Sequence, residues 1–387
     1  MSTIKVNSIK NTSTDDGGIA IDNSGHVQID GQQLATAGAL SNRNLVDNGA
    51  MVIAQRGTSE SGLTNSPAFV VDRFSYRRVG SWGTNSFTMS QQSSGAPGGF
   101  THFLRLAQSG TAAAPPADTA CKLSIALEGF DTAQAGFGTS AAKDITLSFY
   151  AKGSVAGTYC VALQNDDTDQ SYVAEYSLTT SWTRFQITIP ARTTGTWQTD
   201  TSKGFDIYWT VAADSDSTIY GGSAGWNTAN ARWTSNQIET FASTSGATFD
   251  LCGVQLELGE VATPFEHRSF GDELARCQRY YQRASASSGS AYARCIPLGQ
   301  MASSSVLRVV VPLNPTMRAQ PSFNQSGTFA TQPSVGTPGL SIETSSSAGG
   351  ESATLIDNSS ISGTSGNAIA VYANNDDDAF MEFSAEL

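Results

Sequence analysis

The feature that most restricts the fold is a series of strand-like segments separated by turn residues. Alternation of apolar and polar residues indicates a strand with one buried face, and clusters of Gly, Asn, Asp and Ser mark the turns between such strands. No convincing helix interrupts the series. The segments therefore predict an all-β, two-sheet sandwich of the jelly-roll type. They lie at residues 69–77, 86–90, 103–107, 121–128, 145–152, 159–165, 172–178, 183–189, 205–211 and 247–256.

Two of these segments show the pattern most clearly. Residues 185–189, Phe-Gln-Ile-Thr-Ile, alternate throughout. Residues 205–211, Phe-Asp-Ile-Tyr-Trp-Thr-Val, alternate apart from Tyr208. We expect the two segments to form facing core strands.

Composition favours a β-rich, extracellular or virion-like protein. Charged residues make up 14% of the chain, against about 25% in an average globular protein, and small polar residues are abundant. The net charge is −12, so the chain lacks the basic stripe that nucleic-acid binding requires and is unsuited to an anionic membrane surface. No segment approaches the ~20 apolar residues of a membrane span. We expect neither nucleic acid nor membrane as a partner.

The cysteines and the first residues carry no sign of a secreted or metal-binding protein. Cys121, Cys160, Cys252, Cys277 and Cys295 are scattered, without a CxxC pair, so we expect buried free thiols rather than a zinc site. The opening Met-Ser-Thr-Ile-Lys lacks the apolar core of a secretory signal. We expect a protein that stays in the cytosol where it is made or leaves it by cell lysis.

Residues 1–43 contain only very short alternating runs between tight-turn residues. Each run offers one or two apolar side chains, too few for a core of its own. Identical chains around one axis could share these side chains in a common interior, which predicts a homotrimeric β-stem; the alternative is a tail on a monomer. The residues expected to form this interior are Ile4, Val6, Ile19, Ile21, Val27 and Ile29.

One helix is predicted, over residues 270–283. Ser269 can cap it, and acidic residues in its first turn suit the helix dipole. Leu274, Cys277 and Tyr281 share one face by their i, i+3, i+7 spacing. We expect this helical neck to pack on a domain or on its symmetry mates.

A second, smaller β-sandwich is predicted for residues 284–387, where further strand-like runs lie between Ser- and Gly-rich stretches. The domain prediction is a β-stem at 1–43, a jelly-roll domain at 44–268, a helical neck at 269–283 and a C-terminal tip at 284–387.

The sequence contains no enzyme signature. His26, His102 and His267 have no neighbours suggesting a triad, and the hydrolase, metalloprotease and P-loop motifs are absent. The acidic groups near residues 166–169, 214–216 and 376–378 lie in predicted turns, where we interpret them as solvated loop tips. Paired catalytic acids and a structural calcium site are the alternatives. The prediction is a protein that is not an enzyme and has no cofactor.

Sugar binding is more plausible, because glycan sites combine exposed aromatic rings with polar side chains. Aromatic residues beside Gly, Asn and Arg in loop-like sequence are the candidates; the alternative is that they close the ends of the core. Two tyrosines of the C-terminal region, residues 284–387, join them. The candidates are Trp82, Trp197, Tyr220, Trp226, Arg232, Trp233, Tyr292 and Tyr372.

Several stretches together resemble phage tail-fibre proteins. Asn44-Leu-Val-Asp-Asn-Gly-Ala-Met51, followed by Gln55-Arg-Gly57 and Val71-Asp-Arg-Phe74, resembles the opening of a domain common in these fibres. Residues 253–268, Gly-Val-Gln-Leu-Glu-Leu-Gly-Glu-Val-Ala-Thr-Pro-Phe-Glu-His-Arg, resemble its closing strand and are also similar to carbohydrate-binding-module jelly rolls. Residues 274–281 and 311–323 resemble the helix and distal domain that follow. Residues 2–7 with 25–31 resemble the start of fibres from phages of marine bacteria and cyanobacteria.

The resemblance implies a structural protein of a bacteriophage virion. A tail fibre that adsorbs to the host as a homotrimer is the first expectation. Its N-terminus would bind other virion proteins, either a tail nozzle or adaptor or the capsid, and its distal part a host surface polysaccharide or outer-membrane receptor. A capsid or collar fibre with a decorating role is the alternative within this class, and a glycan depolymerase is the alternative from another class.

Overall fold

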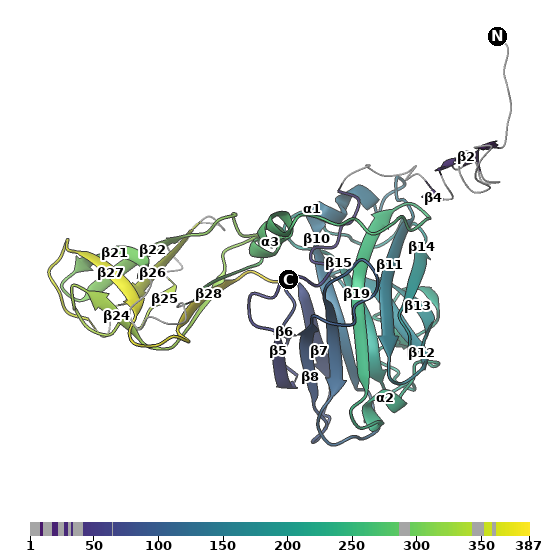
Figure 1. Cartoon of the computed structure of the whole chain (residues 1–387), viewed down its shortest axis with the longest axis horizontal. Coiled ribbons are helices and arrows are strands. Elements are labelled where there is room, and N and C mark those ends of the chain that lie inside the picture. The colour runs from purple at the N-terminus through teal and green to yellow at the C-terminus, as the bar shows by residue number, and fades with distance from the viewer. Residues whose placement is uncertain are drawn as a thin grey trace, which may run out of the picture. The chain divides into compact units, whose positions relative to one another are not determined.

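The computed structural model describes residues 8–10, 18–21, 27–29, 32–33, 42–63, 65–285, 295–342, 352–357 and 361–387. The chain divides into two units, residues 1–268 and 269–387. Strands dominate both units, so the predicted all-β class is confirmed (Figure 1). Among the residues that the structure describes, no helix is long and apolar enough to span a membrane.

Unit 1 contains the predicted jelly-roll sandwich, built from two antiparallel sheets. The seven-stranded sheet has the order β17 (Gly225–Asn227), β13 (Ser171–Leu178), β12 (Gly157–Gln164), β15 (Lys203–Ala213), β10 (Ala120–Glu128), β7 (Phe74–Val79) and β6 (Ala68–Phe69). The six-stranded sheet has the order β14 (Thr183–Ile189), β11 (Ile145–Gly153), β19 (Thr248–Leu258), β9 (Phe103–Gln108), β8 (Phe87–Gln92) and β5 (Ser59–Leu63). Short elements lie between them: α1 (Gly129–Thr132), η1 (Ala133–Ala135), β16 (Gly221–Gly222), β18 (Trp233–Thr234) and α2 (Thr240–Ser243).

The core lies between the two sheets, where alternate residues of each strand meet. Trp209 of β15 is fully buried, with ring centroids 6.3 Å from Phe74 and 5.7 Å from Phe149 of the opposite sheet. The predicted core strands β14 and β15 do lie in opposite sheets, β14 at an edge and β15 in the middle. Cys121, Cys160, Cys252 and Cys277 are buried free thiols, as predicted; the side chain of Cys295 lies outside the described residues.

Two details differ from the sequence prediction. The single strand expected at residues 69–77 is divided into β6 and β7, and Arg73, just before β7, has a positive φ of 73° that an extended strand does not allow. β5 was not predicted, because its sequence Ser-Glu-Ser-Gly-Leu has one apolar side chain and four exposed residues.

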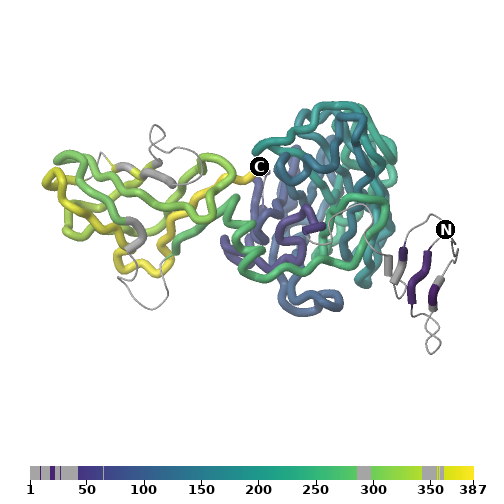
Figure 2. The backbone as a smooth tube through the Cα atoms, turned by 90° about the horizontal axis from the view of Figure 1, so that it is seen from above, coloured from purple at the N-terminus to yellow at the C-terminus, as the bar shows by residue number. Residues whose placement is uncertain are grey.

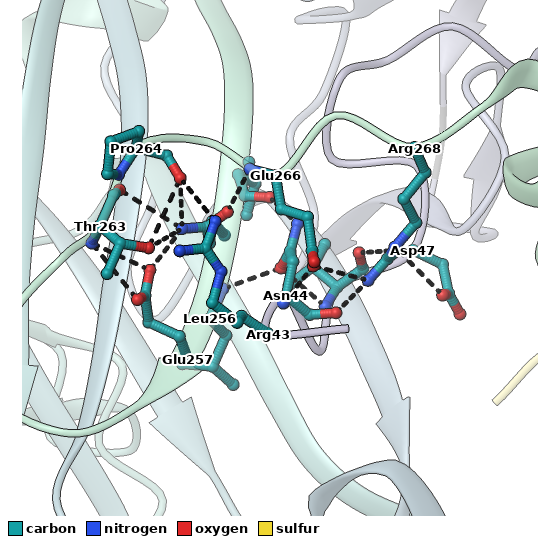
Figure 3. Close-up of polar contacts among 12 residues, drawn as sticks. Arg43, Asn44, Asp47, Leu256, Glu257, Thr263, Pro264, Glu266 and Arg268 are labelled. Carbon is teal, nitrogen blue, oxygen red and sulfur yellow. Dashed lines mark hydrogen bonds and ion pairs between the residues drawn. The ribbon is translucent and has the colours of Figure 1, made fainter. Parts of the chain in front are cut away.

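Polar contacts join the segment that opens the sandwich to the segment that closes it (Figure 3). The Asn44 side chain donates to the carbonyl of Val254 at 3.1 Å and accepts from the amide of Leu256 at 3.1 Å. Arg268 donates to the carbonyl of Val46 at 3.1 Å. At Gly49 a side chain is excluded, since a Cβ would lie 2.0 Å from the Val254 carbonyl oxygen. The two motifs that carry the fibre resemblance thus meet and close this domain.

A separate four-stranded sheet lies near the N-terminus, in the order β1 (Ser8–Lys10), β2 (Gly18–Ile21), β3 (Val27–Ile29) and β4 (Gln32–Gln33). In its register Ile9 lies opposite Ile19, and Ile21 lies opposite Val27. Ile9, Ile19 and Ile21 are 63%, 44% and 46% exposed. Of the predicted stem residues, Ile4 and Val6 lie outside the described residues, and Ile29 is placed only by its backbone.

Unit 2 begins with helix α3 (Phe270–Gln278), which Ser269 caps by accepting from the amide of Asp272 at 3.2 Å. The prediction of a helix to residue 283 is wrong, because strand β20 (Tyr281–Ser285) begins there and pairs with the last strand, β28 (Phe380–Ser384). Figure 2 shows this pairing as the green and yellow tubes running together. Cys277 and Tyr281 are 0% and 1% exposed, so within this unit they are core residues and cannot also form a trimer interface; Leu274 is half-buried.

The rest of unit 2 is a small two-sheet arrangement around its own core. One sheet has the order β20, β28 and β23 (Ser322–Ser326). The other has the order β24 (Phe329–Gln332), β27 (Ala368–Ala373), β21 (Cys295–Ser303), β22 (Val306–Pro312), β26 (Ser352–Asp357) and β25 (Ser341–Ile342). Leu298 and Val310 lie opposite each other on β21 and β22 and are 71% and 52% exposed.

Candidate glycan-binding surface

The outer face of the seven-stranded sheet carries polar side chains in successive rows across its central strands. Directly opposed residues of antiparallel strands share a face. Lys122 of β10 opposes Thr210 of β15, and two residues along, Ser124 opposes Tyr208. The next row is formed by Asp206 of β15 and Gln164 of β12. Because β10, β12 and β15 are central, this face lies over the middle of the domain.

A segment without long strands, residues 214–237, covers part of this face. Trp233 is fully buried there with Cys160, Ala162 and Val173. Its indole nitrogen donates to the carbonyl of Asp214 at 3.1 Å. This apolar contact fixes the segment on the sheet and places the neighbouring Arg232 beside the polar rows.

Arg232 and Lys122 both lie against the ring of Tyr208. The Arg232 guanidinium carbon is 4.7 Å from the Tyr208 ring centroid and 4.8 Å from that of Tyr220. The Lys122 ammonium is 4.2 Å from the Tyr208 centroid. Burial, followed by the positive charge of Arg232, lowers the pKa of Lys122 well below its usual value. A lysine, an arginine and two tyrosine rings therefore form the centre of the cluster.

Asp206 supplies the negative charge of the cluster. One carboxylate oxygen accepts from the hydroxyl of Tyr208 and from the Lys203 ammonium at 3.1 Å. Lys203 also forms an ion pair with Asp166 at 3.1 Å. The side chains of Lys203 and Asp166 are 22% and 40% exposed, so the cluster reaches solvent on their side.

Three buried polar atoms of the cluster have no hydrogen-bond partner in the described part of the chain. They are Oδ1 of Asp206, Oε1 of Gln164 and Nε of Arg232. Their residues are 3%, 0% and 9% exposed. A buried polar atom without a partner costs about 1–3 kcal/mol, and such groups are uncommon in folded proteins. We call Gln164, Lys122, Asp206, Tyr208, Tyr220 and Arg232 the Tyr208 cluster; it offers hydrogen-bond donors and acceptors beside aromatic rings, as sugar recognition requires.

The structure brings some of the sequence candidates together here and removes others. Tyr220 and Arg232 belong to the Tyr208 cluster. Trp233 adjoins it, but its ring is fully buried, and Trp82, 4% exposed, packs on Phe87 in the core. Trp82 and Trp233 are therefore core residues rather than binding rings, because both indoles pack within apolar clusters of the sandwich.

The other candidates lie apart from this cluster. Trp197 and Trp226 meet in a second aromatic group, with centroids 6.1 Å apart. Trp197 is 9% exposed and closes the core, as the alternative interpretation held, whereas Trp226 is half-buried under Arg192 at 5.2 Å. Tyr372 is half-buried on β27 of unit 2, and Tyr292 lies outside the described residues.

The sequence prediction missed Gln164, Lys122, Asp206 and Tyr208. Each lies within a predicted strand, where a polar residue was interpreted as facing solvent. Two signals were present: Tyr208 broke the alternation of its strand, and Lys122 stands between apolar residues. Neither signal identifies a site without the register that places the two residues on adjacent strands.

Two of the acidic turn residues that were considered for calcium or catalysis accept from backbone amides, while Asp166 pairs with Lys203. Asp214 accepts from the amide of Asp118 at 2.7 Å, and Asp376 accepts from that of Thr328 at 2.7 Å. Across the described residues, no group of three or more His, Cys, Asp or Glu is arranged to hold a metal ion.

Comparison of the sequence with protein-family models and with curated proteins finds no match. Three similar solved structures illustrate the structural comparison. The enzymatically active domain of bacteriophage CBA120 tailspike protein 4 is 10% identical at a TM-score of 0.29, over 56% of this chain and 21% of that one. The family 11 carbohydrate-binding module of cellulase Lic26A-Cel5E of Clostridium thermocellum is 13% identical at 0.27, over 54% of this chain and 100% of the module. TmCBM61, solved with β-1,4-galactotriose, is 9% identical at 0.26, over 56% of this chain and 100% of that one.

The present chain thus spans about a fifth of the tailspike chain. All three TM-scores are below 0.5, so we base no argument on these likenesses. The neighbours include carbohydrate-binding modules and a phage tailspike domain.

Proposed function

We propose that this chain is a fibre protein of a bacteriophage virion that binds a host-surface glycan and does not cleave it. The observation that carries the glycan-binding part is the Tyr208 cluster, in which unpartnered buried polar atoms lie beside two tyrosine rings. Rings that meet the apolar face of a sugar, together with polar atoms that meet its hydroxyls, are what such a site needs. The fibre part rests on the sequence resemblance, whose opening and closing motifs form the contacts of Figure 3.

Assembly as a homotrimer is part of this proposal. The sheet β1–β4 presents Ile9, Ile19 and Ile21 with 44–63% of their surface exposed, and a sheet with an uncovered apolar face requires a second layer. Identical copies supply that layer without another protein. Leu298 and Val310 form a second exposed apolar pair, in unit 2, which further copies would also cover. Three linked sites can raise apparent affinity by ~10²–10⁴ if they bind together.

Glycan binding can be tested with the full-length protein, purified surface polysaccharide and host cells. We expect saturable binding without release of reducing ends. Tyr220→Ala removes a half-buried ring of the cluster and should weaken binding at least tenfold. Trp182→Ala, which changes a half-buried ring on the other sheet, is the matched control and should bind normally. Release of reducing ends would instead establish a depolymerase, and equal binding by both variants would exclude the cluster as the site.

Assembly can be tested separately by light scattering. Ile19→Ser and Ile21→Ser together should lower the molar mass from three copies towards one. Ile219→Ser changes an isoleucine of similar exposure, 56%, in the sandwich, and should leave the mass unchanged. A trimer that survives the double substitution would move the interface to the Leu298 and Val310 pair or elsewhere.

The position on the virion needs a third test. Deleting residues 1–43 should leave a soluble protein that no longer joins particles, because the proposed anchor is removed. Electron micrographs of particles carrying the labelled full-length chain would separate a tail fibre from a capsid or collar fibre. Normal incorporation of the truncated protein would contradict the anchor.

A further inference from the structure

We infer that the Tyr208 cluster binds an acidic sugar, with Lys122 and Arg232 facing its carboxylate. This inference rests on the proposed glycan-binding function and adds the chemical class of the ligand. It follows from the balance of charge in the cluster and from the partners that its side chains lack.

Positive charge is in excess around Lys122, although the whole chain carries −12. The charged groups that act on Lys122 are Arg232, Arg77 and Lys203 on the positive side and Asp206 on the negative side. Asp206 is already bound to Lys203 at 3.1 Å. Lys122 and Arg232 are therefore left without a carboxylate of their own in the described structure.

The contacts of Lys122 are unusual for a lysine that is 2% exposed. Its amino group can donate three hydrogen bonds when protonated; within the described residues it lies 4.2 Å from the Tyr208 ring centroid and forms no ion pair with a carboxylate. Burial lowers the pKa of Lys122, because removing an ion from water costs several kcal/mol. A carboxylate bound beside Lys122 would favour its charged form and supply an acceptor for its N–H groups.

The contacts of Arg232 also favour a carboxylate as the ligand group. Its guanidinium lies between Tyr208 and Tyr220, and its Nε–H has no acceptor. A planar guanidinium is the side chain best suited to a planar carboxylate. The unpartnered oxygens of Asp206 and Gln164 are acceptors, which suit the hydroxyls of the same sugar. Donors and acceptors together thus describe a sugar that carries both a carboxylate and hydroxyl groups, such as a uronic acid.

The experiment uses an array of bacterial capsular and lipopolysaccharide glycans, with each acidic glycan placed beside its carboxyl-reduced form. Full-length protein should bind acidic glycans at least tenfold more tightly than their reduced forms. Lys122→Met should lower that affinity at least tenfold, since truncating one partner of a buried charge pair is costly. Lys152→Met is the matched control: Lys152 lies on the other sheet, already paired with Asp250 at 3.7 Å, and its loss should not change binding.

Each remaining outcome contradicts the inference in a distinct way. Binding to neutral and acidic glycans alike would overturn the acidic-sugar specificity and leave the proposed function standing. Acidic binding that survives Lys122→Met would move the site away from the Tyr208 cluster. Absence of binding to every glycan on the array would contradict both the inference and the glycan-binding function.

Discussion

The two sheets of the sandwich bury polar residues on their outer faces in opposite ways. On the six-stranded sheet, Asp250 is 1% exposed and accepts two hydrogen bonds from Arg105, at 2.7 and 2.8 Å. Gln255 and Glu257 bind each other and Thr263, in the segment that follows β19. None of these side chains has an unpartnered buried atom. On the seven-stranded sheet, Asp206, Gln164 and Arg232 each have one.

This difference distinguishes the two outer faces by how completely the polar groups named on each are hydrogen-bonded. The segment around 259–268 covers part of the six-stranded sheet and binds Gln255 and Glu257, while Asp250 is bound by Arg105 and Lys152 of the sheet itself. The segment 214–237 covers the other sheet with an apolar contact at Trp233 and leaves the polar rows unmatched. Removing a hydrogen-bond partner on the outer face of the six-stranded sheet should therefore lower the stability of the domain. Removing an unpartnered polar group on the outer face of the seven-stranded sheet should raise it.

The largest effect is expected for Asn44→Ala, on the matched side. The Asn44 side chain binds the backbone of Val46, Val254 and Leu256 and is buried. Its loss leaves buried backbone groups without partners, at about 1–3 kcal/mol each. We expect unit 1 to lose about 3 kcal/mol or more in urea unfolding followed by tryptophan fluorescence.

The control for this variant is Asn65→Ala. The Asn65 side chain also donates to a backbone carbonyl, that of Gly80 at 2.9 Å, but in an exposed position. Water can replace that bond, so we expect a change within about 0.5 kcal/mol. Equal losses in the two variants would contradict the idea that burial of the matched contacts determines their contribution.

A gain of stability is expected for Lys122→Met, on the unmatched side. Replacing a buried ionic group by an apolar side chain of similar size is often stabilising, by about 1–4 kcal/mol. Because the pKa of Lys122 is lowered in the folded protein, its cost is complete below the folded-state pKa and disappears as the pH rises to the unfolded-state value of about 10.4. The stability difference between variant and parent should therefore be largest below the folded-state pKa and shrink as the pH rises towards 10, as measured by urea unfolding across a pH series. A variant less stable than the parent at pH 7 would show that Lys122 has a structural partner.

The sequence predicted the sandwich because apolar and polar residues alternate along its strands. This alternation depends only on which residues face the core. β14 was predicted with its observed bounds. The outer faces were not predicted. Asp206, Thr210 and Gln255 occupy the polar positions that suggest solvent, yet all are at most 3% exposed, since segments outside the strands of the sheets cover them. The Tyr208 cluster was predicted only in part for the same reason. Tyr220 and Arg232 were candidates because they lie in loop-like sequence, whereas Asp206 and Lys122 lie within predicted strands and were not candidates.

The smallest effect is expected for Lys152→Met, which sharpens the comparison by making the same substitution on the matched sheet. The Lys152 ammonium lies 3.7 Å from Asp250 and 4.9 Å from the Trp182 ring centroid, with 26% of its side chain exposed. A partly exposed ion pair contributes about 0.2–1 kcal/mol, and Arg105 remains to neutralise Asp250. We expect a loss of less than about 1 kcal/mol in urea unfolding, opposite in sign to Lys122→Met. Raising the salt concentration should shrink this loss, because a partly exposed ion pair is screened. If both lysine variants shift stability in the same direction, the contrast between matched and unmatched sheet faces fails, and the lack of a partner at Lys122 no longer points to a ligand.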